Sequence, residues 1–307
     1  MFTYPKKVMS IAELVENCKA AQLTITSDEE AAELFMKIGF YRLRGYAYQF
    51  YDKQTKTYKS GTTLDQILQI YRFDKELSHL IFRFITEIEV ALRANLIHAL
   101  LGKYDDALIL YEPAIFFDKN LFWKNMSKIS SEIVRSNDPF IMHNYENYDG
   151  QIPLWAVVEV LSFGTLSKII KNLQRGPNSA YSIFSRQYSF VSSNGAHVNP
   201  TQSVLSSWVQ ATVVLRNRCA HNSRIYNRSI NVAPVLLDAD KTHSTSRYNG
   251  LYHNLMALKY LRPDDKSWET FADELSRIIA SYEPYINLKR LSFPEDWRTH
   301  MQLNCGM

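Results

Sequence analysis

The stretch TLDQILQIYRFDKELSHLIFRFITEIEVALRANLIHALL, residues 63–101, decides the fold class of this chain. Its apolar side chains recur every three or four residues, which is the period of an amphipathic α-helix. Glu89 and Arg93 form an i,i+4 pair of opposite charge on its polar side. At about 1.5 Å per residue, the stretch predicts a helix of about 60 Å, with a break near residues 73–74 as the alternative.

The composition also favours helices. The 307 residues include 10 glycines and 10 prolines, which is about half the usual share of roughly 12%. Because so few residues favour turns, long helices fit this chain better than many short strands. Hydrophobic residues make up 46% of the chain, so a sizeable core is available and disorder throughout is excluded. We therefore expect an all-α protein.

Five further helical signals lie along the chain. Ser27 to Glu30 resembles a capping box and predicts a helix that stops at Gly39. Pro153 opens a helix over PLWAVVEVLSFGTLSKIIKNL, residues 153–173. Residues 201–220 predict a third helix, and weaker signals cover residues 250–261 and 267–281. We divide the chain into a small helical, basic-aromatic N-terminal part, residues 1–60, and a helical domain, residues 61–307.

Charge and cysteine usage limit the function classes. The net charge of +4 is mildly basic and compatible with a local surface for RNA. The longest stretch without a formal charge, residues 187–215, is rich in polar side chains and cannot span a membrane. Three cysteines far apart in sequence do not suggest a disulfide framework or a metal site. We expect a soluble cytoplasmic protein with no membrane partner; the cysteines are Cys18, Cys219 and Cys305.

One short cluster carries the candidate chemistry. The sequence has no nucleophile elbow, no phosphate-binding P-loop, no dinucleotide-binding glycine motif and no H-E-x-x-H motif. LRNRCAHNSR, residues 215–224, instead gathers arginines and a histidine at the end of an otherwise uncharged helix. Its Arg-x4-His spacing also occurs in Arg93 and His98, so the spacing alone discriminates little. Asn217 after the arginine distinguishes the first pair.

The extended motif LRNRCAHNSRIYNR, residues 215–228, resembles the signature of the abortive-infection Abi family, the AbiD/AbiF group within the HEPN superfamily. Four more segments resemble that family in the same order. One position departs from the family, whose members usually carry a second histidine where this chain has Asn222. The four segments are GFYRLRGYAYQF (39–50), IYRFDKELSHLIFRFITEIEVALRA (70–94), PLWAVVEVLSFGTLS (153–167) and LSFPEDW (291–297).

The resemblance implies an HEPN-type helical bundle, dimerisation through the motif helix, and RNA cleavage without metal or cofactor. It implies a toxin in anti-phage defence, as in toxin–antitoxin systems, which a structured noncoding RNA can restrain. RNA would be the partner, and no DNA is expected. Arg216 and His221 would form the catalytic pair, supported by Asn217.

Elementary chemistry agrees with that implication. Cleavage of RNA without metal needs a base for the 2′-hydroxyl, an acid for the departing 5′ oxygen and a cation at the phosphorane oxygens. An imidazole, with its ordinary pKa near 6.5, can perform either proton transfer. One His221 cannot perform both at once, whereas two copies at a two-fold axis could. Five helical residues turn by about 140°, so Arg216 and His221 converge only if the arginine reaches around or the helix ends near the histidine.

Other residues are candidates for RNA contacts. Arg218 and Arg224 flank the motif histidine and would bind phosphates. In the N-terminal part, Arg42 and Arg44 would also hold phosphates while Tyr46 stacks on a base; half-buried packing is an equal alternative for the tyrosine.

Structural explanations stand beside these functional ones. Arg216 and His221 could simply bond the last carbonyls of their helix. Glu159, in an apolar stretch, is expected to bond buried backbone or an arginine, and Arg93 to pair with Glu89. The rival function is an RNA-binding HEPN protein without catalysis, which Asn222 keeps open. A third reading, a toxin silenced by modification of a tyrosine, is disfavoured because Ser223 occupies that position.

Overall fold

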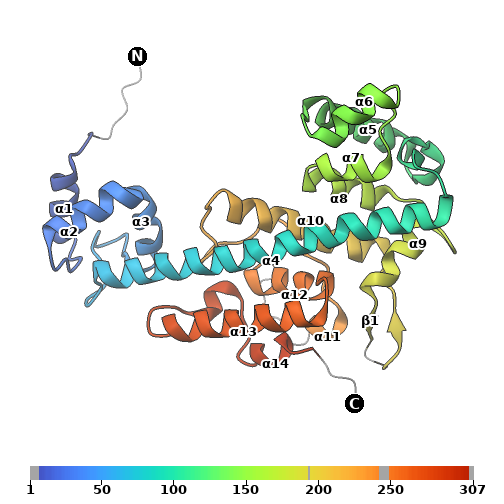
Figure 1. The fold of residues 1–307 in the computed structure, drawn as a ribbon. Coiled ribbons are helices and arrows are strands. Elements are labelled where there is room, and N and C mark those ends of the chain that lie inside the picture. Colours follow the sequence, from blue (N-terminus) through green and yellow to red (C-terminus); the bar gives the residue numbers. More distant parts are fainter. Residues whose placement is uncertain (1–6, 193, 242–248, 304–307) are drawn as a thin grey trace. The chain divides into compact units, whose positions relative to one another are not determined.

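A computed structural model describes residues 7–192, 194–241 and 249–303 (Figure 1). Helices make up most of this part, and its one sheet is a two-stranded hairpin of β1 (Phe190–Val191) and β2 (His197–Val198). The prediction of an all-α protein is confirmed. Cys305, one of the three cysteines considered above, lies outside the described residues. No helix among the described residues is both long and apolar enough to cross a membrane.

The chain forms two compact units. The first, called here the N-terminal unit, contains the residues up to Leu77 together with Ser276–Asn287. The second, called the helical unit, contains Ser78–Leu275 and the residues from Leu288 onward. The division into domains after residue 60 stays a prediction.

In the N-terminal unit, helix boundaries follow local signals. Ser27 accepts a hydrogen bond from the amide of Glu30 and so begins the predicted helix. That helix passes into a short π-helical turn that ends at Gly39, whose φ of +91° suits glycine. The basic-aromatic segment that follows is largely helical. The helices are α1 (Ile11–Ala20), α2 (Asp28–Leu34) and α3 (Phe40–Ala47).

The long helix predicted from residues 63–101 is confirmed as α4 (Leu64–Tyr104). It continues through residues 73–74 without a break, because both side chains there have buried surroundings. Phe73 is fully buried. Asp74 is 3% exposed and accepts a hydrogen bond of 2.7 Å from the hydroxyl of Tyr46.

In the helical unit, short helices gather around α4 and α10 (Figure 1). The sequence analysis did not predict α5 and α6, although Phe122, Ile129 and Ile133 recur at helical spacing in α5 and are all buried. The remaining helices are α5 (Lys119–Arg135), α6 (Pro139–Asn147), α7 (Leu154–Val160), α8 (Phe163–Asn172), α9 (Ala180–Ser185), α10 (Gln202–Ala220), α11 (Asp238–Lys241), α12 (Leu251–Leu261), α13 (Asp265–Tyr282, which ends in the N-terminal unit) and α14 (Trp297–Met301).

The prediction of one helix over residues 153–173 is wrong, because the chain forms two helices, α7 and α8. Ser162 is extended and caps α8 by accepting from the amide of Thr165. The carboxylate of Glu132 on α5 accepts from the Ser162 amide at 2.9 Å and from its hydroxyl at 2.8 Å. An acidic side chain at a helix N-terminus is favourable, so these contacts stabilise the break.

Helix α10, predicted over residues 201–220, is confirmed and lies in the core of the helical unit. It packs against α8 and α12. Trp208 is buried and stacks on Tyr260 of α12 with ring centroids 4.9 Å apart. Leu215 and Cys219 are also buried, so the last two turns of α10 are held by packing. Cys219 thus lies in the core as a small apolar side chain.

Candidate functional site

The motif residues lie where α10 ends. The helix ends at Ala220, and the amide of His221 still donates to the carbonyl of Asn217 at 3.0 Å. Asn222 then adopts a left-handed conformation with a φ of +51°, which asparagine tolerates better than most residues. The amide of Ser223 donates back to the carbonyl of Arg218 at 2.9 Å. The chain therefore turns away directly after the histidine.

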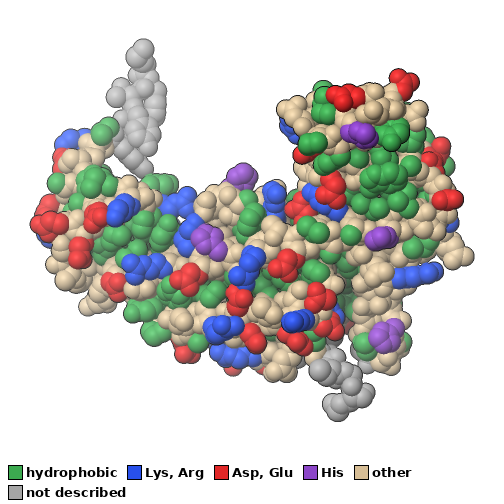
Figure 2. Space-filling view, in the orientation of Figure 1, with side chains coloured by type: hydrophobic (Ala, Val, Ile, Leu, Met, Phe, Trp, Pro, Cys, Tyr) green, Lys and Arg blue, Asp and Glu red, His purple; other side chains and the backbone are tan. Residues whose placement is uncertain are grey.

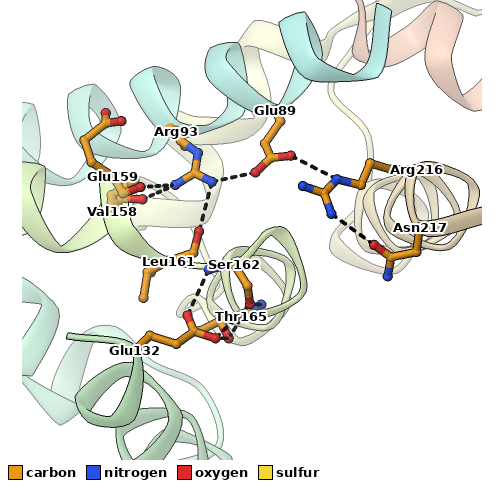
Figure 3. A network of polar contacts seen from close by, with 10 residues as sticks. All are labelled: Glu89, Arg93, Glu132, Val158, Glu159, Leu161, Ser162, Thr165, Arg216 and Asn217. Atoms are coloured by element: carbon orange, nitrogen blue, oxygen red, sulfur yellow. Dashed lines mark hydrogen bonds and ion pairs between the residues drawn. The ribbon is translucent and has the colours of Figure 1, made fainter. Parts of the chain in front are cut away.

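Arg216 points from α10 towards α4 (Figure 3). Its Nε atom lies 3.8 Å from Oε2 of Glu89, and its Nη1 donates to the side-chain oxygen of Asn217 at 3.3 Å. The guanidinium carbon lies 5.9 Å from the ring centroid of Phe82. Phe82 and Glu89 are seven residues apart on α4 and so share one face of it. Arg216 is thus oriented towards this face of α4, although its Nε makes no hydrogen bond to any described residue.

Glu89 also binds a second arginine. One carboxylate oxygen accepts from Nη2 of Arg93, one turn further along α4. The predicted pairing of these two residues is confirmed.

Arg93 in turn caps the end of α7. It donates to the carbonyl of Glu159 at 3.1 Å, to that of Leu161 at 2.9 Å, and to that of Val158. The last carbonyls of a helix have no partner within it and carry partial negative charge. A guanidinium therefore suits this place, and Arg93, with a side chain 12% exposed, acts as a structural residue.

The charges of the three side chains do not cancel. Two guanidinium groups share one carboxylate, which leaves a net charge of +1. Glu89 has a side chain only 11% exposed, whereas the side chain of Arg216 is 35% exposed. The excess positive charge is therefore most accessible to solvent at Arg216. A partly exposed, fixed guanidinium suits an anionic ligand such as a phosphate.

His221 is exposed, and its imidazole makes no hydrogen bond to any residue that the structure describes. Within the same part of the chain, no contact joins this ring to the side chain of Arg216. Arg216 and His221 were expected to converge only if the arginine reached around the helix or if the helix ended near the histidine. The helix does end next to His221, but Arg216 reaches towards α4. The His98 ring, in the other Arg-x4-His pair, is exposed too, but its arginine is engaged at the end of α7.

The other candidate residues fall into two places. Arg218 and Arg224 are half-buried at the end of α10, where Nη1 of Arg218 lies 3.5 Å from the Arg224 carbonyl. Arg42 and Arg44 are exposed on α3 in the N-terminal unit. Tyr46 is only 3% exposed, so the packing alternative describes it and its ring is not available to a base.

Sequence reasoning misjudged one residue and missed one contact. Glu159 is exposed instead of lying in an apolar interior, and only its carbonyl contacts Arg93. The link from Glu89 to Arg216 was not predicted, since it joins helices 127 positions apart and leaves no local pattern. Among the described residues, no group of three or more His, Cys, Asp or Glu side chains could hold a metal ion.

Comparison with known proteins extends this picture. The family model described as "Abi-like protein" matches residues 33–227, from α2 to one residue before the end of the extended motif. No curated protein and no solved structure shows a significant match. The matched region covers more than half of the chain and contains Glu89, Arg93, Arg216 and His221. The chain therefore belongs to the Abi-like protein family, which supports a role in abortive infection.

Proposed function

We propose that this protein is a metal-independent endoribonuclease toxin of an anti-phage abortive-infection or toxin–antitoxin system, and that two copies of the chain build its active site. The observation that carries the proposal is the end of α10. There Arg216 is held by Glu89 while the His221 imidazole is left exposed to solvent.

His221 would act as the proton-transfer group. The 2′-hydroxyl of a ribose attacks the adjacent phosphorus and loses its proton to one imidazole. The bond from phosphorus to the 5′ oxygen breaks, and a second imidazole protonates that oxygen. The products are a 2′,3′-cyclic phosphate and a 5′-hydroxyl. The imidazole is suited to both roles because it gains and loses a proton near neutral pH.

Arg216 would stabilise the charge that develops on the phosphorane oxygens. A preorganised cation acts most strongly when it does not have to move during the reaction. The neighbouring Glu89, Asn217 and Phe82 support such preorganisation, because each lies beside this guanidinium before RNA binds. Asn217 supports the arginine through its side-chain oxygen.

Two copies would supply the second histidine. The motif has Asn222 where members of the family that it resembles usually carry a second histidine, so one chain offers a single His at this turn. A two-fold axis near the end of α10 would place both His221 rings and both Arg216 side chains at one phosphate. The lack of contact between Arg216 and His221 within the described chain is consistent with such a composite site.

The remaining basic residues would hold the RNA backbone. Arg218 and Arg224 flank the motif, and Arg42 and Arg44 are exposed on α3. Contacts of this kind position RNA without reading its sequence. The same residues would serve a structured noncoding RNA that restrains the toxin.

The test is cleavage of labelled transfer and messenger RNA by the purified, RNA-free chain in EDTA. His221→Ala should slow cleavage about 10²–10⁴-fold, and Arg216→Ala about 10²–10³-fold. His98→Ala and Arg135→Ala are matched controls, because both residues are exposed in the helical unit outside the motif. Wild-type products should carry cyclic phosphate ends.

Two results would contradict the proposal. Wild type that binds RNA but never cuts it would leave the non-catalytic RNA-binding protein as the better description. Cleavage that survives in both motif variants would place the chemistry elsewhere. Equal melting temperatures for all four variants would ensure that lost cleavage does not reflect unfolding.

A further inference from the structure

A second site is built by α6, α7, the loop between them and residues 107–108, and none of the motif residues lines it. It is an open cavity of about 630 Å³, within the size range of sites that bind ligands. Apolar side chains gather over α6 and α7 in Figure 2. The side chains that line it include Phe140, His143, Tyr148, Trp155 and Glu159.

Helical spacing explains the lining. Phe140 and His143 are three residues apart on α6, and Trp155 and Glu159 are four apart on α7, so each pair shares a helix face. The two helices pack against each other, which turns both faces into one cavity. The loop between them adds Tyr148, whose ring meets that of His143 edge to face at 5.5 Å.

The aromatic rings are exposed to an extent that a closed core would not allow. Trp155 is 48% exposed, Tyr148 58% and Phe140 39%. Large apolar side chains gathered on an open surface mark interaction sites. The rings therefore form a surface suited to a flat or cationic group.

The charge around the cavity indicates which of the two groups, flat or cationic, suits it better. Residues 136–167 contain four carboxylates, those of Asp138, Glu146, Asp149 and Glu159, and no lysine or arginine. No lysine or arginine lines the cavity either. Arg93 contacts the main chain at the end of α7 and pairs with Glu89, a carboxylate that it shares with Arg216. Glu159 is exposed, and its carboxylate has no ion-pair partner among the described residues.

This charge disfavours RNA and favours a cation. Phosphates need nearby lysine or arginine, and the one charged side chain that lines the cavity is instead the carboxylate of Glu159. A cation gains from the faces of Trp, Tyr and Phe and from a carboxylate at the same time. Arginine suits both, because its planar guanidinium stacks on rings and donates two parallel hydrogen bonds to a carboxylate.

We propose that the cavity between α6 and α7 binds an arginine side chain presented by a basic segment of a partner protein, with Trp155 stacking on the guanidinium and Glu159 accepting its hydrogen bonds. The volume exceeds that of one side chain, so residues next to the arginine lie in the cavity as well. The site contains none of the motif residues and does not rest on the proposed nuclease activity.

The experiment uses the full chain with its five tryptophans replaced by 5-fluorotryptophan. Fluorine NMR gives one signal for each, and Trp155→Phe identifies the signal of residue 155. The probe is acetyl-Gly-Arg-Gly-amide, with the glutamine and leucine peptides and guanosine monophosphate as comparisons. The arginine peptide should shift the Trp155 signal, and the glutamine peptide should not.

Two variants separate the carboxylate in the cavity from general acidity. Glu159→Gln should lower the affinity for the arginine peptide about threefold to tenfold, because it removes the ion pair and leaves the stacking surface. Glu146→Gln is the matched control: Glu146 is an exposed carboxylate on α6 that does not line the cavity. It should change the affinity by less than twofold.

The proposal is overturned if the arginine peptide leaves the Trp155 signal unchanged up to its solubility. It is equally overturned if the leucine peptide or guanosine monophosphate shifts that signal at lower concentration, or if Glu159→Gln binds the arginine peptide as wild type does. RNA cleavage should be the same in wild type and in Glu159→Gln.

Discussion

Glu89 and Arg216 face each other across α4 and α10, with the carboxylate Oε2 3.8 Å from the guanidinium Nε. The second oxygen of the same carboxylate binds Arg93, which caps the end of α7. One largely buried carboxylate thus connects three helices. The motif arginine and the break between α7 and α8 depend on the same side chain.

Glu89→Gln should lower the kcat of RNA cleavage about tenfold. The amide keeps the size of the side chain but no longer holds the guanidinium by charge, and a loss of about 1.4 kcal/mol in the transition state is a factor of ten. Substrate binding should change less than kcat, because the phosphate-binding arginines stay in place. Single-turnover kinetics far below the melting temperature would measure both.

A loss of stability alone would mimic this result, so a control is needed. Glu132→Gln removes the carboxylate that holds the N-terminus of α8, in the same unit and without contact to Arg216. Both variants should melt at a lower temperature than wild type, but only Glu89→Gln should lose kcat. Equal kcat in the two variants would show that Glu89 does not position the motif arginine for cleavage.

Mixing wild type with His221→Ala tests the composite site. If both histidines act at one phosphate, only dimers of two wild-type chains cleave, and activity falls as the square of the wild-type fraction. If each chain works alone, activity falls in direct proportion. The two chains would be unfolded together, refolded at a series of ratios and assayed at constant total protein. Proportional loss would exclude a shared site.

The sequence predicted the parts of the fold that rest on local pattern. The apolar period of α4 continues through residues 73–74, and the capping residue Ser27 begins its helix as expected. It failed where a tertiary contact overrides the period. Nothing in residues 153–173 reveals that Glu132 and Arg93 stabilise a break there.

In the candidate site, too, the helix that depends on local sequence was predicted, and contacts between helices were not. The helix predicted over residues 201–220 does end at Ala220, and the left-handed conformation of Asn222 just beyond it was not predicted. The contact of Glu89 with Arg216 could not be predicted, because no pattern within one helix specifies its neighbour in another. Tyr46 shows the converse, a residue whose aromatic and basic neighbours suggested RNA although its own ring is buried.

Tyr46→Phe should destabilise the protein and leave RNA binding unchanged. The variant removes the 2.7 Å hydrogen bond to the buried carboxyl of Asp74, and such a loss costs about 1–3 kcal/mol. Tyr41→Phe is the matched control on the same helix, since Tyr41 is 84% exposed. Urea unfolding measures the first effect, and RNA binding at fixed salt the second. Weaker RNA binding by Tyr46→Phe alone would favour the stacking role.

The stability of the helical unit should fall in mild acid because of His253. This residue of α12 is fully buried, and burial lowers the pKa of its imidazole from 6.5 to about 4. Between these values the unfolded chain binds a proton that the folded chain does not. The contribution of His253 to the free energy of unfolding therefore rises with pH across this window and is fully present above pH 6.5. At 1.36 kcal/mol per pH unit, the loss from pH 7 to pH 5 is about 2 kcal/mol.

His253→Gln should remove this part of the pH dependence. Asp240 has the opposite sign, because burial raises the pKa of its carboxyl and the folded chain then binds the extra proton. Both proteins retain Asp240, so its effect cancels when the free energies of unfolding are subtracted at each pH. Urea unfolding at pH 7 and pH 5 gives the four values required. If the difference between wild type and variant is the same at both pH values, His253 does not titrate on unfolding in this window.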